Sequence, residues 1–572
     1  MESQTSDVVP ARRWEEAVCV VALLLPLAAW DSLHAASWAP KATLLLLIVV
    51  PGVVALGNLV VRRDRAAWAG TAFLLVAGLS TALSSNPVLS LLGDYNWGTG
   101  WLFLVAVVGL WAIGRHMSAA GRRTLTQALV AAVLLSAVLA VVQGSISNLP
   151  PVLAPYPATP QGLTGNSAFL GALMAMGMCL VVPRVGRQVI HWRWLAAVAL
   201  VAAGLELSAA RISLALALVV VLVGIRHASW AVRLAVVAAV VIGITVTNLA
   251  PNVSQSGTQR VISTGTSGAV TTSDSTRFGT WELGLVALPH YAVIGSGPGR
   301  FGEATLPHMT VAQARRLRTN YYSDAHNFVL QYATTTGLLG LAALLVFLGL
   351  AGRRARGQLA RTALAAGIVC LVEPQNVVIV PLALLALGAS DPASALTTAA
   401  LSPFRTWRGV VAGIGVLLAA AAGGLFLYGD VLVARAEVSA DPGIAANAAH
   451  RLPPWPDPDV VAAKATAFHA VSGSNRASSR PVAIAWAQRA VDDDTALPSS
   501  WSLLGDYLSR WRSAEAGEAA FRRALAANPW DEESLVGLAT AQDRLGQTSA
   551  MHGTCLRLAR LVAPHAPHAP CR

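Results

Sequence analysis

Charged residues are scarce in this chain of 572 residues: Asp, Glu, Lys and Arg make up 12% of it, whereas 55% of it is hydrophobic. A soluble domain carries about 25% charged residues, so this composition excludes an ordinary soluble protein. Apolar runs of about 20 residues recur along the chain, and that length crosses a bilayer as a helix. The sequence therefore predicts an all-α fold, a polytopic membrane helix bundle.

Lysine is almost absent, and cysteine is rare. Only Lys41 and Lys464 are lysines among the 41 basic residues, so arginine supplies most of the formal net charge of +12. Most arginines lie in short links between apolar segments, which favours a topological explanation over nucleic-acid binding. The five cysteines have no zinc-ligand spacing, and we expect neither a metal site nor a cofactor. Cys555 and Cys571 would form a disulfide if the C-terminal tail lies in an oxidising compartment.

Apolar segments and arginine clusters together predict the topology. Clusters follow every second segment, from Arg62-Arg63 to Arg405 and Arg408, and with Arg12-Arg13 they mark one cytoplasmic face. The N-terminus has no convincing signal-peptide cleavage site, so we expect the first apolar segment to be a span. The pattern predicts about 12–13 spans within residues 1–430 and an external C-terminal domain. The apolar segments are residues 16–30, 41–61, 67–84, 101–114, 125–143, 167–183, 194–210, 212–225, 232–250, 327–351, 362–372, 377–390 and 409–429.

The longest external link, residues 251–325, is the expected catalytic loop. Links of this length are usually functional or disordered, and its first part, residues 252–276, is rich in Ser, Thr and Gly. Arg277 and Trp281 then open a short amphipathic helix, and a glycine-rich turn follows. Arginines in membrane proteins usually gather on the cytoplasmic face, so those on the outer face need another explanation. We expect them to bind an anionic ligand. These arginines are Arg277, Arg300, Arg315, Arg316 and Arg318.

Two further positions combine charge with a membrane boundary. Arg211 lies between two apolar stretches on the outer side, where it either snorkels to the interface or holds a diphosphate by paired hydrogen bonds. His326 follows Asp324 where the long loop re-enters an apolar segment. An ionisable residue at that boundary indicates a functional site. The alternative is a structural helix start that Asn327 caps.

The residues after His326 complete a motif. His326-Asn327 is followed by nine residues, Gly337, two residues and Gly340. Over about residues 85–390 the chain resembles the O-antigen ligase family, which groups O-antigen ligases, polymerases of related surface polysaccharides and bacterial protein O-oligosaccharyltransferases. Matching features upstream are Gly165-Asn166 at the start of a span, Arg211, Arg277 before Trp281, and the Gly295–Gly297 turn. The family's usual Ser-Arg-Gly is Ala-Arg-Ile around Arg211, so Arg211 matches less well than Arg277 or His326.

The resemblance implies a C-type membrane glycosyltransferase fold and a metal-independent, inverting reaction. The donor would be a glycan on a polyprenyl diphosphate, and the implied type of lipid is undecaprenyl. Arg211 and Arg277 would stabilise the leaving diphosphate, and His326 would act as general base with a near-neutral pKa. Asp324 either orients the imidazole or faces water. The remaining residues assigned to substrate binding are Asn327, Trp281, Arg300, Arg318 and Tyr322.

The acceptor stays open at this point. Ligation to a lipid or surface acceptor, polymerisation of repeat units and transfer to protein share the same donor chemistry. A polysaccharide or lipid transporter is the alternative of another class, although we find no internal duplication; an inactive scaffold is a third interpretation. The expected location is the bacterial cytoplasmic membrane, with the catalytic loop and the C-terminal domain outside. The expected partners are the donor, a glycan, lipid or protein acceptor, and membrane lipids.

The C-terminal region, residues 440–565, has a different, charged and alanine-rich composition. Trp501, Leu504-Gly505, Phe521 and Pro529 follow a tetratricopeptide pattern. We therefore expect a small α-solenoid of the tetratricopeptide type, which either binds a protein partner or serves only in packing. Residues 566–572 are Pro-rich and expected to be a disordered tail.

Overall fold

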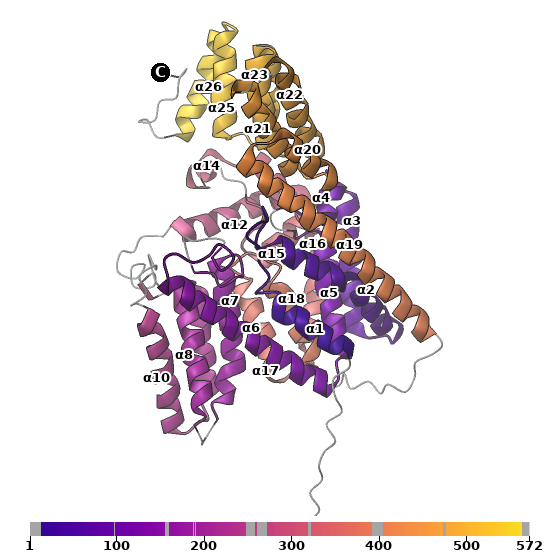
Figure 1. Ribbon diagram of the computed structural model, residues 1–572, viewed down its shortest axis with the longest axis vertical. Helices are drawn as coiled ribbons and strands as arrows, with labels where there is room; N and C mark the ends of the chain where they lie inside the picture. Colours follow the sequence, from indigo (N-terminus) through magenta and orange to yellow (C-terminus); the bar gives the residue numbers. More distant parts are fainter. Residues whose placement is uncertain are drawn as a thin grey trace, which may run out of the picture.

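A computed structural model describes residues 13–95, 98–154, 160–186, 188, 190–247, 258–259, 272–317, 322–391, 404–472, 476–562 and 571. Figure 1 shows a bundle of helices that carries a second, smaller group of helices at one end, and no strand occurs among the described residues. This confirms the all-α membrane-bundle prediction. Five stretches are long and apolar enough to cross a membrane: Ala39–Val61 (α2), Ala119–Ser145 (α6), Ser167–Arg184 (α7, Ser167–Val181, with the 3-10 turn after it), Trp230–Thr247 (α10) and Gly409–Ser439 within α19.

Shorter helices complete the bundle around a central helix, α5. Residues Phe103 to Arg115 of α5 are all buried, and α5 packs against α2, α3 and α18. The contact with α2 is close, because a Cβ added at Gly52 would lie 2.7 Å from the Cα of Gly109. The shorter helices are α1 (Arg13–Leu24), α3 (Arg65–Ala82), α4 (Pro87–Leu92), α5 (Trp101–His116), α8 (Trp192–Leu207), α9 (Arg211–Ile225), α17 (Gly357–Val369) and α18 (Ile379–Ala389).

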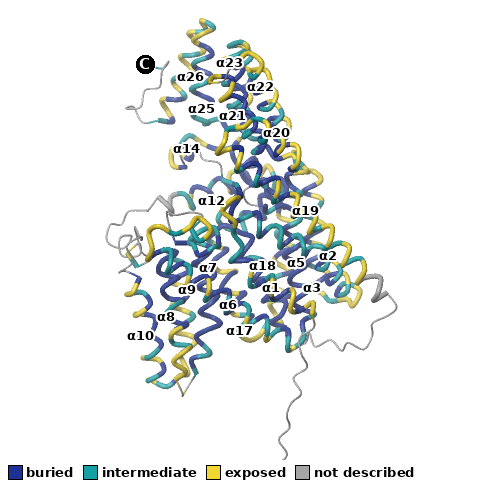
Figure 2. Tube along the Cα trace, in the orientation of Figure 1, coloured by how far each residue is buried: buried dark blue, intermediate teal, exposed yellow. Residues whose placement is uncertain are grey.

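Apolar side chains also cover much of the outer surface of the bundle. Leu417 and Leu418 on α19 are 71% and 66% exposed, and Trp230 on α10 is 77% exposed. Figure 2 shows such exposed residues along the outward sides of α10 and α19, with buried residues facing the interior. A surface of this kind fits lipid rather than water.

The predicted span 327–351 is two helices, α15 (Phe328–Thr335) and α16 (Gly337–Gly352). Gly337 has a φ of +71°, a left-handed conformation that favours glycine. The glycine-rich turn packs against this break, since the N–H groups of Ser296 and Gly297 donate to the carbonyls of Thr334 and Thr335 at 3.1 and 2.9 Å. The amides of the turn therefore stabilise the break between α15 and α16. Both glycine motifs, at Gly295–Gly297 and at Gly337, thus have a structural role.

The long external loop contains more helix than the sequence suggested. α12 runs over Thr272–Tyr291, a helix of 20 residues, where we expected a short helix. The helices α13 (Phe301–Thr305), η2 (Leu306–His308) and α14 (Val311–Leu317) follow. Most of the Ser/Thr/Gly-rich part, residues 252–276, lies outside the described residues.

Helix α19 (Phe404–Ser439) leads from the bundle into the C-terminal helices. Three helical hairpins follow α20, and within each hairpin the two helices pack together: α21 with α22, α23 with α24, and α25 with α26 (Figure 1). The C-terminal helices are α20 (Pro442–Arg451), α21 (Pro456–Ser472), α22 (Arg476–Asp493), α23 (Pro498–Trp511), α24 (Ala514–Ala527), α25 (Glu532–Arg544) and α26 (Thr548–Leu561).

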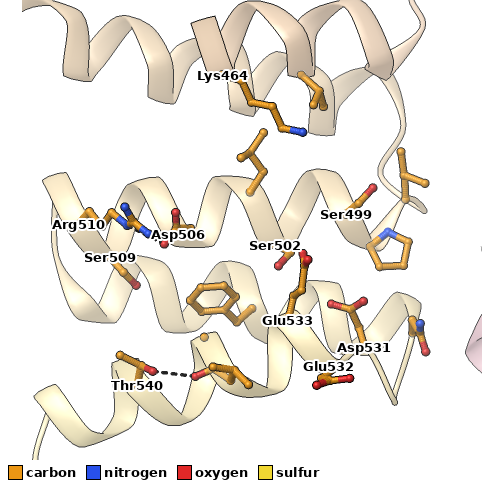
Figure 3. Close-up of a pocket in the computed structure, with 18 of the residues that line it drawn as sticks. Lys464, Ser499, Ser502, Asp506, Ser509, Arg510, Asp531, Glu532, Glu533 and Thr540 are labelled. Atoms are coloured by element: carbon orange, nitrogen blue, oxygen red, sulfur yellow. Dashed lines mark hydrogen bonds and ion pairs between the residues drawn. The ribbon is translucent and has the colours of Figure 1, made fainter. Parts of the chain in front are cut away.

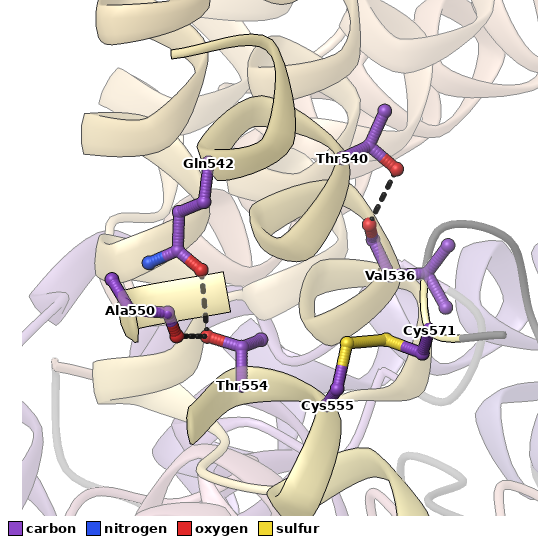
Figure 4. Close-up of a disulfide and its surroundings, with 7 residues drawn as sticks. All are labelled: Val536, Thr540, Gln542, Ala550, Thr554, Cys555 and Cys571. Atoms are coloured by element: carbon purple, nitrogen blue, oxygen red, sulfur yellow. Dashed lines mark hydrogen bonds between the residues drawn. A yellow bond between two sulfur atoms is a disulfide. The ribbon is translucent and has the colours of Figure 1, made fainter. Parts of the chain in front are cut away.

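A disulfide joins Cys555 on α26 to Cys571, with 5.4 Å between the two Cα atoms (Figure 4). The pairing that the sequence left open is therefore present. It ties Cys571 to the last helix, while residues 566–570 and 572 of the expected disordered tail lie outside the described residues.

The C-terminal helices dock on the outer loops of the bundle through specific polar contacts. Trp455 Nε1 donates to the Gly93 carbonyl at 2.9 Å, and Trp530 Nε1 donates to the Met309 carbonyl at 3.0 Å. Tyr95 is buried, and its hydroxyl donates to Asp430 of α19. Tyr95 thus packs its loop against α19.

Candidate functional site

A cavity of about 240 Å³ lies where five segments of the bundle meet. The segments are the start of α7, the link between α8 and α9, the first turns of α12, the loop before α15 and the corner before α18. They contribute Asn166, Ser167, Ala168, Ser208, Ala209, Ala210, Thr276, Arg277, His326, Glu373 and Pro374. Two of the predicted catalytic residues, Arg277 and His326, therefore line the same cavity.

The backbone at His326 is strained and firmly held. His326 has a φ of +54°, and the lining residue Ala209 has a φ of +52°; such conformations cost about 1–3 kcal/mol and persist where the surroundings enforce them. Asp324 Oδ1 accepts the His326 N–H at 2.6 Å, and Trp281 Nε1 donates to the His326 carbonyl at 3.4 Å. Thr280 Oγ1 also donates to the Ala325 carbonyl at 3.1 Å. Helix α12 and the Asp324 side chain thus fix where His326 lies.

The imidazole of His326 is arranged as a proton acceptor. Its Nδ1 lies 3.2 Å from the Asp324 carbonyl oxygen, and a carbonyl only accepts, so this bond places the ring proton on Nδ1. In the neutral ring, Nε2 is then the basic nitrogen. Burial lowers the pKa of His326 to about 4; the bond to Asp324 opposes this shift and the charge of Arg277 adds to it. The near-neutral pKa expected from the sequence is wrong because the ring is buried.

Asp324 orients the backbone of the loop. It is 6% exposed, and its second oxygen accepts the Gln375 N–H at 3.3 Å. Burial raises the pKa of Asp324 to about 7, although the two N–H donors favour the charged form. Its carboxylate therefore connects the His326 loop to the corner before α18, and its carbonyl rather than its carboxylate meets the imidazole.

Arg277 forms an ion pair across the cavity. Its Nη2 lies 2.6 Å from Glu373 Oε1, and the two side chains are 19% and 5% exposed. Glu373 is the residue that the sequence analysis missed, because its position in the Glu-Pro-Gln-Asn corner indicated only an external turn. The sign of Glu373 in the sequence was that an acidic residue lies in a short link between two apolar segments.

Asn166 and Arg211 belong to the neighbouring helix starts. Asn166 lines the cavity and caps α7, accepting the Ala168 N–H at 2.8 Å. Arg211 is the first residue of α9, directly after the lining residue Ala210, and is partly exposed. The structure thus places Arg211 next to the cavity wall, on a different helix from Arg277.

Of the residues assigned to substrate binding, Trp281 and Asp324 contact His326, whereas the other described ones do not line this cavity. Asn327 Oδ1 caps α15 by accepting from Val329 and Leu330 at 2.9 and 3.2 Å, which is the structural alternative considered for it. The Tyr322 hydroxyl donates to the Leu317 carbonyl at 3.4 Å, and its ring packs against an apolar cluster that includes C-terminal helices. Arg300 is 2% exposed and pairs with Asp494. Arg318 lies outside the described residues.

The fold and the cavity define a helical multi-pass membrane protein with a partly buried histidine beside an arginine at one end of its helices. Residues 194–345, from α8 to α16, match the family model described as O-Antigen ligase. The matched segment contains Arg211, Arg277 and His326, whereas Asn166 and Glu373 come to the cavity from outside it. No curated protein matches the chain. The family match supports a glycosyl-transferring membrane enzyme that uses a lipid-linked glycan donor and an acceptor.

Proposed function

We propose that this protein transfers a glycan from a polyprenyl diphosphate to an acceptor hydroxyl on the outer face of the cytoplasmic membrane. The observation that carries the proposal is the cavity in which His326 and Arg277 meet, two residues of the segment that matches the O-antigen ligase model. Breaking the anomeric bond releases a lipid diphosphate, whose growing charge needs a cation. Arg277 on the cavity wall, with Arg211 beside it, supplies fixed positive charge without a metal ion.

His326 takes the proton of the acceptor hydroxyl. Nε2 is the accepting atom, because Nδ1–H is engaged by the Asp324 carbonyl. The acceptor oxygen then bonds to the anomeric carbon as the bond to the diphosphate oxygen breaks, and attack opposite the leaving group inverts the configuration. A diphosphate bound at Arg277 adds negative charge near the ring and stabilises the imidazolium that forms.

Glu373 positions Arg277 in this scheme. Its carboxylate is buried and lies within hydrogen-bond distance of the guanidinium. A bound diphosphate would share the guanidinium with Glu373, since arginine carries five N–H donors. The ion pair would therefore hold Arg277 at the cavity wall before the donor arrives, which reduces the side-chain entropy lost on binding.

The disulfide between Cys555 and Cys571 supports the external location of the C-terminal helices, because disulfides persist in oxidising compartments. The arginine clusters on the other side of the bundle support the same orientation. A protease added to right-side-out membrane vesicles should then cleave exposed loops of the C-terminal helices, whereas protection in these vesicles and cleavage in inverted ones would reverse the orientation.

The experiment is a reconstitution in liposomes with undecaprenyl-diphosphate glycan and candidate acceptors. The intact protein is compared with His326→Ala and Arg277→Ala, with and without a chelator. We expect release of the lipid diphosphate that needs both residues and survives chelation, and the mass of the product separates ligation, polymerisation and transfer to protein. Transport of the donor without its consumption would overturn the proposal in favour of a transporter. Activity of both variants equal to that of the intact protein would overturn it in favour of a scaffold.

A further inference from the structure

A second hollow lies among the C-terminal helices and is separate from the cavity at His326. It has a volume of about 1310 Å³. The first helix of each hairpin, α21, α23 and α25, lines it along one face (Figure 3). We call this hollow the inner groove. One end reaches the bundle, where His34 and Leu306 complete the lining.

Each of the three helices presents side chains at helical spacing to the inner groove. On α21 these include Asp457, Val461 and Lys464. The equivalent face of α23 carries Ser499, Ser502, Asp506 and Arg510, and that of α25 carries Glu533, Val536, Thr540 and Arg544. Spacings of three and four residues place these side chains on one side of a helix. The inner groove is thus a continuous surface of three parallel faces.

The charge of the inner groove is opposite in sign to that of the whole chain. Its lining contains six carboxylates (Glu437, Asp457, Asp506, Asp531, Glu532 and Glu533) and three cations (Lys464, Arg510 and Arg544), a formal charge of −3 with His34 neutral. The protein as a whole has a formal charge of +12. The concave, partly enclosed shape of the groove concentrates this negative potential.

The charges are also sorted along the inner groove. Figure 3 shows Asp531, Glu532 and Glu533 toward one end, and Arg510 toward the other. Asp506 pairs with Arg510 at 2.8 Å, and Asp531 caps α25 by accepting the Ser534 N–H at 3.0 Å. Hydroxyl groups of Ser499, Ser502 and Thr540 also line the groove and suit hydrogen bonds to a polar chain.

The lining favours a polypeptide over a glycan. Phe521 is the aromatic ring other than His34 in the lining, and at 3% exposure it offers little ring face for a sugar to stack on. Valine and leucine side chains alternate with the charged ones, as at Val461, Leu503 and Val536. An extended polypeptide presents backbone amides, cationic side chains and apolar side chains along one line, and this mixture matches the lining.

We propose that the inner groove binds an extended, lysine- or arginine-containing segment of a polypeptide, with its cations at the acidic end formed by Asp531, Glu532 and Glu533. The groove is held against the catalytic loop. Leu306 lines it, and Leu306, Met309 and Leu317 pack with Phe521 and Leu535 in one apolar cluster. A polypeptide in the groove is therefore presented beside the loop that leads to His326, whichever reaction takes place there.

The test measures binding of labelled peptides to the full chain in detergent by fluorescence anisotropy, without donor. The probes are a lysine-rich peptide, a glutamate-rich peptide of the same length and a neutral one. Glu533→Lys changes the acidic end, and Glu515→Lys on α24 is the matched control, because Glu515 is also exposed but lies outside the lining. Thr540→Trp blocks the groove sterically without changing charge.

We expect tighter binding of the lysine-rich peptide than of the other two, weakening as salt is added. Glu533→Lys should lower its affinity about tenfold, equivalent to about 1.4 kcal/mol, whereas Glu515→Lys should leave it unchanged. Thr540→Trp should weaken it as well. Equal affinity for the three peptides, no binding, or equal losses in Glu533→Lys and Glu515→Lys would overturn the proposal. His326→Ala should bind normally, so failure of the transferase reaction and failure of the groove are distinguishable.

Discussion

Arg277 and Arg300 lie on the same outer segment, and the sequence predicts an anionic ligand for both, yet the structure uses them differently. Arg277 is 19% exposed, lines the cavity and pairs with Glu373. Arg300 is 3% exposed, and both of its terminal nitrogens lie 2.9 Å from the carboxylate of Asp494. The region at Arg277 is a site with room for a ligand, whereas the region at Arg300 is a clamp between bundle and C-terminal helices. An unexpected outer arginine thus indicates an anion, but that anion can belong to the protein.

Arg300→Ala should have the largest effect on stability. It leaves the buried Asp494 carboxylate without its partner, and breaking a buried pair costs about 3–5 kcal/mol. Hydrogen exchange of α22 and α23 should accelerate, and the melting temperature should fall. Arg300→Ala/Asp494→Ala should recover part of the loss. Unchanged exchange in the single variant would show that the clamp contributes little to docking.

Arg277→Ala should affect activity more than stability. Loss of a charge that stabilises the leaving diphosphate lowers kcat by a factor of about 10²–10³. Steady-state rates of donor consumption measure this, with a melting curve as the control for folding. Arg277→Lys keeps the charge but loses the planar fork and should recover only part of the rate. If folded Arg300→Ala protein consumed the donor as slowly as Arg277→Ala does, the distinction between a ligand site at Arg277 and a structural ion pair at Arg300 would be wrong.

Glu373→Gln should have a smaller effect. Glutamine keeps an acceptor for Arg277 but removes the charge, and the difference between a charged and a neutral hydrogen bond corresponds to a factor of about five to ten in rate. We expect kcat to fall and the chain to remain folded. An increase in kcat would instead mean that Glu373 competes with the diphosphate and does not position Arg277.

The pH dependence should be weak in the range where an ordinary histidine titrates. Burial lowers the pKa of His326 to about 4, so the ring is neutral and basic at pH 6–8, and activity is lost only as the pH falls toward 4. A profile of kcat/KM between pH 5 and 8 checks this. Loss of activity with a midpoint near the usual histidine pKa of about 6.5 that persists in Asp324→Asn would contradict the lowered pKa of His326.

A separate change near pH 7 would belong to Asp324, whose pKa burial raises to about 7. As the pH rises through this value, Asp324 becomes charged and its bonds to the N–H groups of His326 and Gln375 strengthen. Asp324→Asn should abolish that change and leave the acidic limb in place. Persistence of the change in Asp324→Asn would assign it to another group.

The sequence predicted the helical bundle well and the interior of the site only in part. Helices cover most of the apolar segments, although the segment 327–351 is divided at Gly337 and α19 extends beyond 409–429, because hydrophobic length is a local property and helix ends are not. His326 and Arg277 were found through their motif and their place on the outer loop. Glu373 was missed, because its partner lies 96 residues away. Arg300 was assigned to substrate because Asp494, 194 residues away, gave no sign of the pairing.

By itself, the sequence determined that the chain is a helical membrane protein, where its apolar segments lie, and which histidine and arginine to test. Periodicity, length and charge act over short stretches, and these properties follow from them. Only the tertiary structure decided that His326 is partly buried, that Glu373 faces Arg277, that Asp494 pairs with Arg300 and that three hairpins line an acidic groove. Each of these depends on which distant segments pack together, and packing sets burial, and through burial the pKa values and ion pairs.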